Sequence, residues 1–382
     1  MTKLHIVVRS ITEDRGVGGL ERSAYLHLKA MLSLGIQIDL YSPQTLKGAD
    51  GLTCLEVPWP RSAGKVGMGV AYWRWCKRVA DLLGSRIEPR QILHLHGASA
   101  GVLRFLPRSE AKQAVVVIHG MEEFSNDGLV RESNRYFIRK LAVSGTDTAN
   151  TVVATDTALV PAVKRNFPNM AGRLTVIPNA VDVAALRELS HVDTDPPGKE
   201  PAYVSVVSVG RLVRNKGFDL AVDALRTLND RGNSRPVCWQ LFGSGPEADA
   251  ISRASRDMSG VGFKLIQQAT DAHVQRALAS ADFLLVPSRY EGSSLVTLEA
   301  MAQGAVVVAT PVGGIPDKIT DGVNGYLAEN VSAASLADAL QRAMASSGEH
   351  VRSAALRTVR ENWDISQLAF SYARLYEDSR FD

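Results

Sequence analysis

The sequence has little cysteine, no long apolar run and no strong excess of charge of either sign. Its 382 residues include three cysteines that are far apart in the chain, at Cys54, Cys76 and Cys238. Such cysteines indicate neither a disulfide framework nor a zinc site, and they are typical of a reducing cytosol. No apolar run is long enough to span a bilayer. Because a strand-like segment begins at Leu4, we expect no signal peptide and a cytoplasmic protein.

Charge is nearly balanced over the whole chain but differs between its halves. Residues 1–190 contain 24 Lys and Arg against 17 Asp and Glu, whereas residues 191–382 contain 19 against 23. A basic first half is compatible with an anionic membrane or acidic ligands, and equally with a solvated surface that has no partner. We expect no nucleic-acid partner.

Apolar strand-like runs alternate with helix-period segments, and the chain is too long for one ordinary core. The expected strands are 4–8, 36–41, 91–95, 114–118, 151–154 and 174–177, followed by 203–209, 237–242, 262–266, 282–287 and 305–309. The expected helices are 19–34, 68–84, 131–143 and 156–167, followed by 216–231, 246–258, 271–279, 294–303 and 333–346. This βαβ pattern occurs twice and predicts an α/β protein with two doubly wound parallel sheets.

A polar, proline-rich segment over residues 193–201 separates the halves as a linker would. We therefore expect one domain over residues 1–192 and a second over residues 200–364. In open α/β sheets, ligands bind outside the carboxyl ends of the strands. Two such domains facing each other would form a cleft, with the linker as its hinge.

Two glutamates eight positions apart, Glu291 and Glu299, follow the predicted strand 282–287. Ser294 is a suitable N-cap for the next helix, and Gly304 is a suitable stop. One carboxylate then lies in the loop and the other lies inside the helix. The free N–H groups of the helix N-terminus between them favour an anion such as a phosphate.

A basic loop follows the first strand of the second half, with Arg211 and Lys216 at a strand's carboxyl end. Two cations suit a diphosphate and stabilise charge that develops on it as it leaves. We favour a functional role for both residues, and a solvated surface position for Arg214.

Glycines and histidines end strands of the first half. The run from Gly16 to Arg22 lets a ligand approach a helix N-terminus, or forms a tight turn without a ligand. It lacks the last small residue of the dinucleotide fingerprint. His119 ends strand 114–118 on the expected cleft side, His96 is expected to be similarly exposed, and His94 is expected in the core.

Two further motifs are assigned structural roles. Gly313 and Gly314, like the turn at 243–247, either approach the ligand or only close the second domain, and we favour the structural role. Asp193 and Asp195 match an Asp-x-Asp metal pattern but fall in the linker, so we expect no metal there.

Taken together, these motifs resemble the retaining glycosyltransferases of family 4, also called group 1, which have the GT-B fold of two Rossmann-like domains facing a central cleft. The resemblance covers nearly the whole chain. It is carried by the N-terminal glycine loop, His119-Gly120, 177–179, 210–217, 243–247, Glu291 to Glu299, and 312–316.

The resemblance implies a nucleoside-diphosphate sugar bound mainly by the second domain, without a metal or other cofactor. Arg211 and Lys216 would bind the diphosphate, and Glu299 would hold the ribose. Glu291 would bind hydroxyls of the transferred sugar, and His119 would contact that sugar near the reacting carbon. The backbone N–H groups of Leu295 and Val296 would bind the distal phosphate. Gly18 and Gly19 would approach the phosphate and the acceptor from the first domain. The resemblance also implies that a last helix, within 365–382, crosses back to the first domain.

The sequence departs from the family pattern at three places. Ser293 and Ser294 replace a common Phe-Gly pair, and their hydroxyls would add donors to the phosphate or sugar. Ala180 replaces a usual glycine. Gln267-Gln268 stands where a glycine is common, so the sequence leaves the base open between UDP- and GDP-linked donors.

The expected reaction is transfer of a hexose, with retention, to a saccharide or a lipid-linked saccharide in bacterial surface polysaccharide or glycolipid synthesis. Aromatic and basic residues at 59–61 and 72–78 favour peripheral contact with an anionic membrane, or form an ordinary amphipathic helix. Two alternatives remain: a GT-B sugar-nucleotide epimerase and a non-catalytic sugar-nucleotide-binding module. A nicotinamide oxidoreductase fits poorly.

Overall fold

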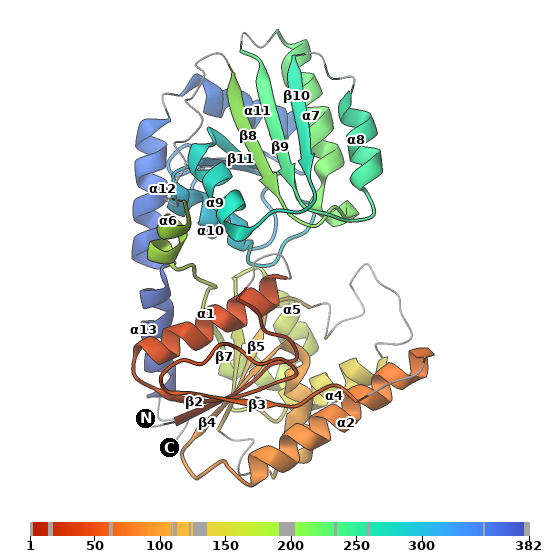
Figure 1. Ribbon diagram of the computed structural model, residues 1–382, viewed down its shortest axis with the longest axis vertical. Coiled ribbons are helices and arrows are strands. Elements are labelled where there is room, and N and C mark those ends of the chain that lie inside the picture. The colour runs from red at the N-terminus through yellow and green to blue at the C-terminus, as the bar shows by residue number, and fades with distance from the viewer. Residues whose placement is uncertain are drawn as a thin grey trace. The chain divides into compact units, whose positions relative to one another are not determined.

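The computed structural model describes residues 3–13, 18–60, 64–107, 109, 113–121, 124, 136–190, 203–232, 235–256, 258, 260–346 and 348–377. The chain divides into two compact units, one of residues 1–179 with 365–382 and one of residues 180–364 (Figure 1). The predicted linker, including Asp193 and Asp195, lies outside the described residues. None of the helices described is long and apolar enough to cross a membrane.

The first unit is built on a seven-stranded parallel sheet with the order β3-β2-β1-β4-β5-β6-β7. Its strands are β1 (Lys3–Val7), β2 (Gln37–Ser42), β3 (Leu52–Glu56), β4 (Ile92–His96), β5 (Ala114–Ile118), β6 (Thr151–Ala154) and β7 (Leu174–Val176). The central strand β5 reads Ala-Val-Val-Val-Ile and is buried along its whole length. A continuous β-branched run of this kind is typical of a parallel strand with both faces covered.

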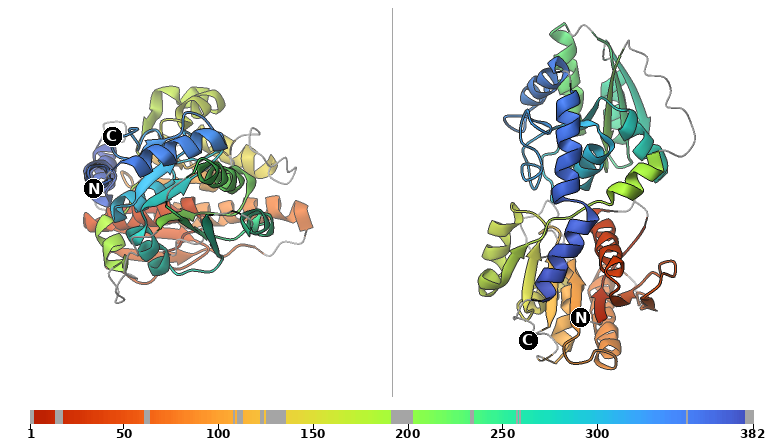
Figure 2. Two further views of the ribbon diagram at one scale, coloured as in Figure 1. Left: turned by 90° about the horizontal axis from the view of Figure 1, so that it is seen from above. Right: turned by 90° about the vertical axis from the view of Figure 1, so that its left-hand side faces the viewer.

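Helices cover both faces of this sheet. They are α1 (Gly19–Ser33), α2 (Gly64–Gly84), η1 (Gly97–Phe105), α4 (Tyr136–Thr146), α5 (Leu159–Asn166), η3 (Pro168–Arg173) and α13 (Ile365–Tyr376). Side chains of α2, η1, α4 and α5 share a core with Leu93 and Leu95 of β4. Helix α1 contacts α13, which returns to this unit from the end of the chain (Figure 2). The return of the last helix agrees with the expectation for this fold.

The second unit is built on a six-stranded parallel sheet with the order β10-β9-β8-β11-β12-β13. Its strands are β8 (Val204–Val209), β9 (Val237–Phe242), β10 (Val261–Ile266), β11 (Phe283–Val286), β12 (Val306–Ala309) and β13 (Tyr326–Leu327). The predicted fold class, an α/β protein with two doubly wound parallel sheets, is therefore confirmed.

Two layers of helices enclose the second sheet. Helices α7 (Phe218–Asp230), α8 (Ala248–Arg256) and α11 (Ala333–Ala345) share one core with it. Helices α6 (Val183–Ser190), α9 (Asp271–Ser280), α10 (Leu295–Gln303) and α12 (Glu349–Asn362) share the core of the opposite face. A short η4 (Arg214–Lys216) lies in the loop after β8.

The boundary between the units falls earlier than the expected position at residue 192. Helix α6 belongs to the second unit because it packs against α9 and α10. The elements not predicted from the sequence are η1, β3, η3, α6, η4, β13 and α12. Helix α12 carries many charged residues and buries only Val351, Ala354, Ala355 and Val359, so its apolar face is narrow.

Candidate functional site

Glu291 forms a close ion pair with Lys216 at the carboxyl ends of β8 and β11. The Lys216 ammonium nitrogen lies 2.7 Å and 2.8 Å from the two carboxylate oxygens, although 75 residues separate the partners. The Ser288 hydroxyl donates a further hydrogen bond of 2.7 Å to Glu291. Glu291 is buried, with 8% of its surface exposed. The two loops thus fix a buried carboxylate in one orientation, and Lys216 is paired with it.

A second ion pair fastens these loops to α7. Both terminal nitrogens of Arg289 donate to the carboxylate of Asp219, at 2.6 Å and 2.8 Å. The backbone N–H of Arg289 donates to the carbonyl of Asn215 at 2.8 Å. Burial raises the pKa of Asp219, but hydrogen bonding and charge from Arg289, with the charge of Arg214, outweigh it and lower that pKa below its ordinary value.

The N-terminus of α10 carries no side-chain cap. Ser294 occupies the N-cap position, as predicted, but its side chain makes no capping hydrogen bond and accepts one of 3.0 Å from the Thr297 hydroxyl instead. The capping function assigned to Ser294 is therefore wrong. The first helical residues, Leu295 and Val296, present N–H groups that no Ser294 oxygen accepts, and such groups bind anions. The predicted stop at Gly304 is confirmed by its left-handed φ of 85°.

Glu299 lies inside α10, also 8% exposed, and is linked to a chain of amides. Gln275 of α9 donates to its carboxylate at 3.3 Å and accepts from Gln303 at 2.9 Å. Gln303 also donates to the carbonyl of Leu186 at 2.7 Å. The sequence analysis missed Gln275, which is fully buried. Its signal was a polar residue three positions before the buried Leu278 of the same helix.

Lys318 is a second residue that the sequence analysis missed. Its side chain is 3% exposed, and its ammonium donates to the Gly314 carbonyl at 2.9 Å and to the Ser293 hydroxyl at 3.3 Å. A lysine is rarely buried, so only its position four residues after a glycine pair hinted at this contact. Lys318 places a positive charge beside Ser293, next to the start of α10.

The glycines around the site permit close backbone contact. Gly313 has a φ of 56°, and a Cβ there would lie 2.1 Å from the Glu291 carbonyl oxygen. Gly314 donates its N–H to the carbonyl of Gly292 at 3.0 Å. These contacts support the expected structural role of the glycine pair, which seats one loop against the other.

Arg211 is exposed at the start of the loop that follows β8. The neighbouring Leu212 donates its N–H to the Ser244 carbonyl at 2.8 Å, so the turn at 243–247 supports this loop, as expected. The second unit thus places eight candidate residues in the loops and the helix that follow the carboxyl ends of β8 and β11, with Lys216 and Glu291 in direct contact: Arg211, Lys216, Glu291, Ser293, Ser294, Leu295, Val296 and Glu299.

The remaining predicted residues, Gly18, Gly19 and His119, belong to the first unit. Gly18 precedes α1 as an N-cap without a side-chain bond, and Gly19 is its first, exposed residue. Gly16 and Val17 lie outside the described residues. Asp39 of β2, an acidic residue near the end of the second strand, forms an ion pair of 2.9 Å with Lys3.

His119 directly follows β5, and its Nε2 lies 2.9 Å from Nδ1 of His96. Burial lowers the pKa of His119 to about 4, so its ring is neutral at pH 7. His96 is only 1% exposed, which contradicts its expected exposure, because its ring packs inward beside His27 and His94. His94 is fully buried, as predicted.

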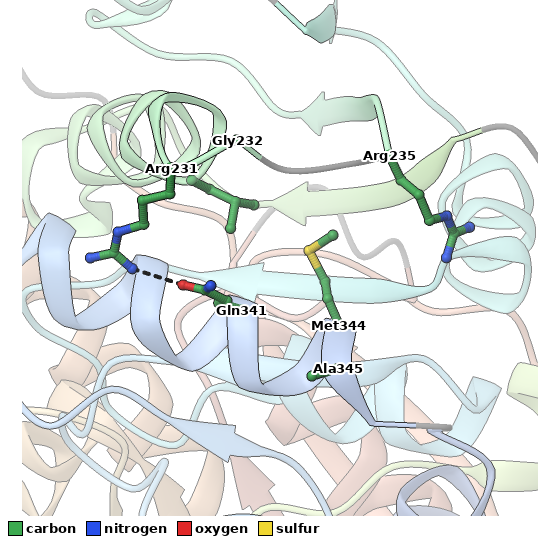
Figure 3. Close-up of a pocket in the computed structure, with 7 residues that line it drawn as sticks. Arg231, Gly232, Arg235, Gln341, Met344 and Ala345 are labelled. Atoms are coloured by element: carbon green, nitrogen blue, oxygen red, sulfur yellow. Dashed lines mark hydrogen bonds between the residues drawn. The ribbon is translucent and has the colours of Figure 1, made fainter.

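A surface pocket of about 280 Å³ lies elsewhere on the second unit (Figure 3). Leu228, Arg231, Gly232, Arg235, Gln341, Met344 and Ala345 line it, and Arg231 donates to Gln341 at 3.0 Å. These residues lie at the carboxyl ends of α7 and α11 or just before β9. The pocket is therefore at the edge of the sheet where its strands begin. It contains none of the candidate site residues.

Two family models match the chain. The model described as Glycosyltransferase Family 4 matches residues 17–185, and the model described as Glycosyl transferases group 1 matches residues 204–346. The two ranges correspond to the two halves of the sequence and include every candidate site residue.

Curated relatives match over part of their length. A glycogen synthase from Pseudomonas paraeruginosa is 37% identical over 153 residues, 39% of this chain and 28% of that protein. An alpha-maltose-1-phosphate synthase from Mycobacterium tuberculosis is 32% identical over 189 residues, 47% of this chain and 48% of that protein. The matches thus span less than half of these relatives.

Solved structures match nearly end to end at low identity. A sucrose-phosphate synthase from Thermosynechococcus elongatus has a TM-score of 0.76 at 18% identity, covering 98% of both chains. WaaG, a glycosyltransferase involved in lipopolysaccharide biosynthesis, has a TM-score of 0.71 at 18% identity, covering 98% of this chain and 100% of its own. At this identity the likeness establishes the fold, which is GT-B.

Proposed function

The chain belongs to the family-4, group-1 glycosyltransferases, and from that membership we propose that it transfers a hexose from a nucleoside-diphosphate sugar to a saccharide or lipid-linked saccharide. The observation that carries the proposal is the Lys216–Glu291 ion pair near the uncapped N-terminus of α10. This arrangement joins a carboxylate suited to sugar hydroxyls with donors suited to a diphosphate. The neighbour HepE from Anabaena, solved in complex with UDP, supports a donor of this class.

Charge at the site would stabilise the leaving diphosphate. Lys216 carries three N–H donors and gives two of them to Glu291, which leaves one for a phosphate oxygen. Arg211, the N–H groups of Leu295 and Val296, and the ammonium of Lys318 would supply further positive potential. Because hydrogen bonds hold Lys216 and Lys318 in place before the donor binds, these two cations would stabilise the charge with little reorganisation.

The proposed reaction retains the configuration at the anomeric carbon and uses no metal. The bond between the anomeric carbon and the phosphate oxygen breaks, and the acceptor hydroxyl attacks from the same face. The departing phosphate oxygen takes the hydroxyl proton, so no side-chain nucleophile is required. Glu291 would orient the sugar through its hydroxyls, and Glu299 would hold the ribose.

The acceptor is proposed from chemistry that the relatives share. Their printed names include synthases of glycogen and of a maltose phosphate, and one structural neighbour acts in lipopolysaccharide synthesis. We therefore place the reaction in polysaccharide or glycolipid synthesis on the cytoplasmic side of a bacterial membrane.

The test is a donor screen followed by activity. Thermal-shift assays with UDP, GDP, ADP and their sugars identify the donor, because a ligand that binds only the folded state stabilises it. With that donor and an oligosaccharide acceptor, Glu291→Gln and Lys216→Met should each reduce turnover by about 10²-fold or more. The product should keep the donor's anomeric configuration by NMR, and the rate should not depend on added Mg²⁺ or Mn²⁺.

Arg226→Met is the control, since its ion pair with Asp223 is exposed on α7. Near-normal turnover of the Glu291 and Lys216 variants would refute the assignment. Release of a free epimerised sugar without an acceptor would instead support an epimerase.

A further inference from the structure

Four histidines and two tyrosines gather on one face of the first sheet, and the proposed transfer reaction does not use most of them. His94 and His96 alternate with Leu93 and Leu95 along β4, so both rings point away from the α2 side. His27 of α1 stacks on His94 with 3.9 Å between ring centroids. Tyr372 and Tyr376 of α13 complete the group.

One ring nitrogen from each of His27, His94 and His96 lies within 4.8 Å of those of the other two. All three side chains are at most 2% exposed. A histidine ring binds a metal ion through a nitrogen that carries no proton.

Each of the three rings has one nitrogen engaged and one without a partner. Nε2 of His27 lies 3.1 Å, and Nδ1 of His94 2.7 Å, from the Tyr376 hydroxyl. Nδ1 of His96 lies 2.9 Å from Nε2 of His119. The opposite nitrogens, Nδ1 of His27 and Nε2 of His94 and His96, have no hydrogen-bond partner among the described residues.

We propose that His27, His94 and His96 form a binding site for one divalent transition-metal ion of the Zn²⁺ class. Hydrogen bonding at the far nitrogen is how metal-bound histidines are usually oriented. Three imidazoles without a carboxylate suit Zn²⁺, Cu²⁺ or Ni²⁺ better than Mg²⁺ or Ca²⁺.

The proton positions follow from the site. With metal on the three unpartnered nitrogens, the N–H groups of His27 and His94 both donate to the Tyr376 oxygen, and His96 donates to His119. A tetrahedral ion with bonds of about 2.0–2.1 Å sets its ligand nitrogens about 3.3 Å apart. From separations of up to 4.8 Å, the nitrogens must therefore close by up to about 1.5 Å. The stacked rings of His27 and His94 must also turn so that both face the ion, and water takes the fourth position.

Such an ion would have a structural role that does not depend on the proposed function. It would join α1 and β4, and through Tyr376 it would fasten α13 to the same face. It would also fix the tautomer of His119, because His96 then donates its only N–H to that ring.

The experiment uses the untagged full-length protein, stripped with EDTA and dialysed. Calorimetric titration with Zn²⁺ should give one tight site per chain, and Co²⁺ should give the visible absorption of a tetrahedral complex. Bound Zn²⁺ should also raise the melting temperature. His27→Phe and His94→Phe keep a ring in the core and should abolish this site. Tyr376→Phe keeps all three ligands and should weaken binding by about 10–100-fold.

His350→Ala, at an exposed position of α12, is the matched control and should bind like the wild type. The proposal is overturned if the folded wild type binds less than one equivalent of Zn²⁺. It is also overturned if folded His27→Phe and His94→Phe retain the tight site. Should those two variants fail to fold, unchanged Zn²⁺ affinity in Tyr376→Phe overturns it.

Discussion

At the scale of single residues, the buried Lys318 was found only from the structure. Its ammonium contacts Ser293 and Gly314. We predict that Lys318→Met weakens binding of a nucleoside diphosphate by about tenfold or more, because a charge-assisted hydrogen bond contributes about 1.5–3 kcal/mol. Isothermal titration with the diphosphate and with the bare nucleoside measures this.

Affinity for the nucleoside should stay unchanged, and Lys318→Arg should recover part of the loss. The control is Arg231→Met, a cation of the same unit that lines the separate surface pocket. Equal losses for nucleoside and diphosphate would show that Lys318 supports the fold and does not act on phosphate.

Asp219 gives a pH dependence whose sign follows from its lowered pKa. Because the folded-state pKa lies below the unfolded value near 3.9, the carboxylate stabilises the fold above that value. This stabilisation disappears as the pH falls through the folded-state pKa. We predict that the melting temperature of Asp219→Asn is lower than that of the wild type at pH 7, and that the difference closes below about pH 4. A difference in melting temperature that stayed constant over this pH range would contradict the prediction.

The sequence could predict which residues belong to the site better than which of them contact one another. Glu291 and Glu299 stand out because they follow an apolar strand and flank a helix start. The Lys216–Glu291 pair joins loops 75 residues apart, which local patterns do not encode. Ser294 was placed correctly but assigned the wrong hydrogen bond, because its neighbour Thr297 competes for it.

At the scale of elements, α9 supports α10 through the amide chain from Gln303 to Glu299. If Glu299 holds the ribose, Gln275→Leu should raise the KM for the donor about tenfold and leave kcat nearly unchanged, because one hydrogen bond to a buried carboxylate is lost. Steady-state kinetics with ribose and 2′-deoxyribose donors checks this.

The variant should discriminate less between the two donors than the wild type. Gln341→Leu, on the exposed face of α11, is the control. If folded Gln275→Leu kept the wild-type preference for the ribose donor, Gln275 would not contribute to ribose binding.

Most elements with strong periodicity could be predicted to within a few residues. Strand β5 was placed to the residue, since its β-branched run has clear ends. Two of the missed elements have weak local signals: β13 has two residues, and α12 has a narrow buried face. These two elements are stabilised by packing against the rest of the unit, and local sequence patterns do not reveal that packing.

At the scale of the whole molecule, α2 carries the proposed membrane-binding surface. Tyr72, Trp75 and Cys76 are buried, whereas the opposite face exposes Trp73, Arg74, Lys77 and Arg78. The aromatic and basic residues of α2 are thus divided between the core and the surface. The four exposed ones are those that would contact a membrane. We predict sedimentation with anionic vesicles and none with neutral ones, since each basic residue near such a surface contributes about 1 kcal/mol.

Lys77→Glu with Trp73→Ala should reduce sedimentation strongly, and Arg226→Glu, a basic residue of the second unit, should not. Absence of binding to anionic vesicles at low salt would leave α2 as an ordinary amphipathic helix.

The return of α13 to the first unit has a consequence for synthesis on the ribosome. Residues 1–179 emerge first, but the helix that covers His27 and His94 is translated only after all of residues 180–364. The unit that begins to fold first therefore receives this helix late, and the part of the sheet face that α13 covers beside α1 stays exposed during that interval. Nascent chains at this stage should be the species that chaperones protect, because uncovered apolar surface promotes aggregation.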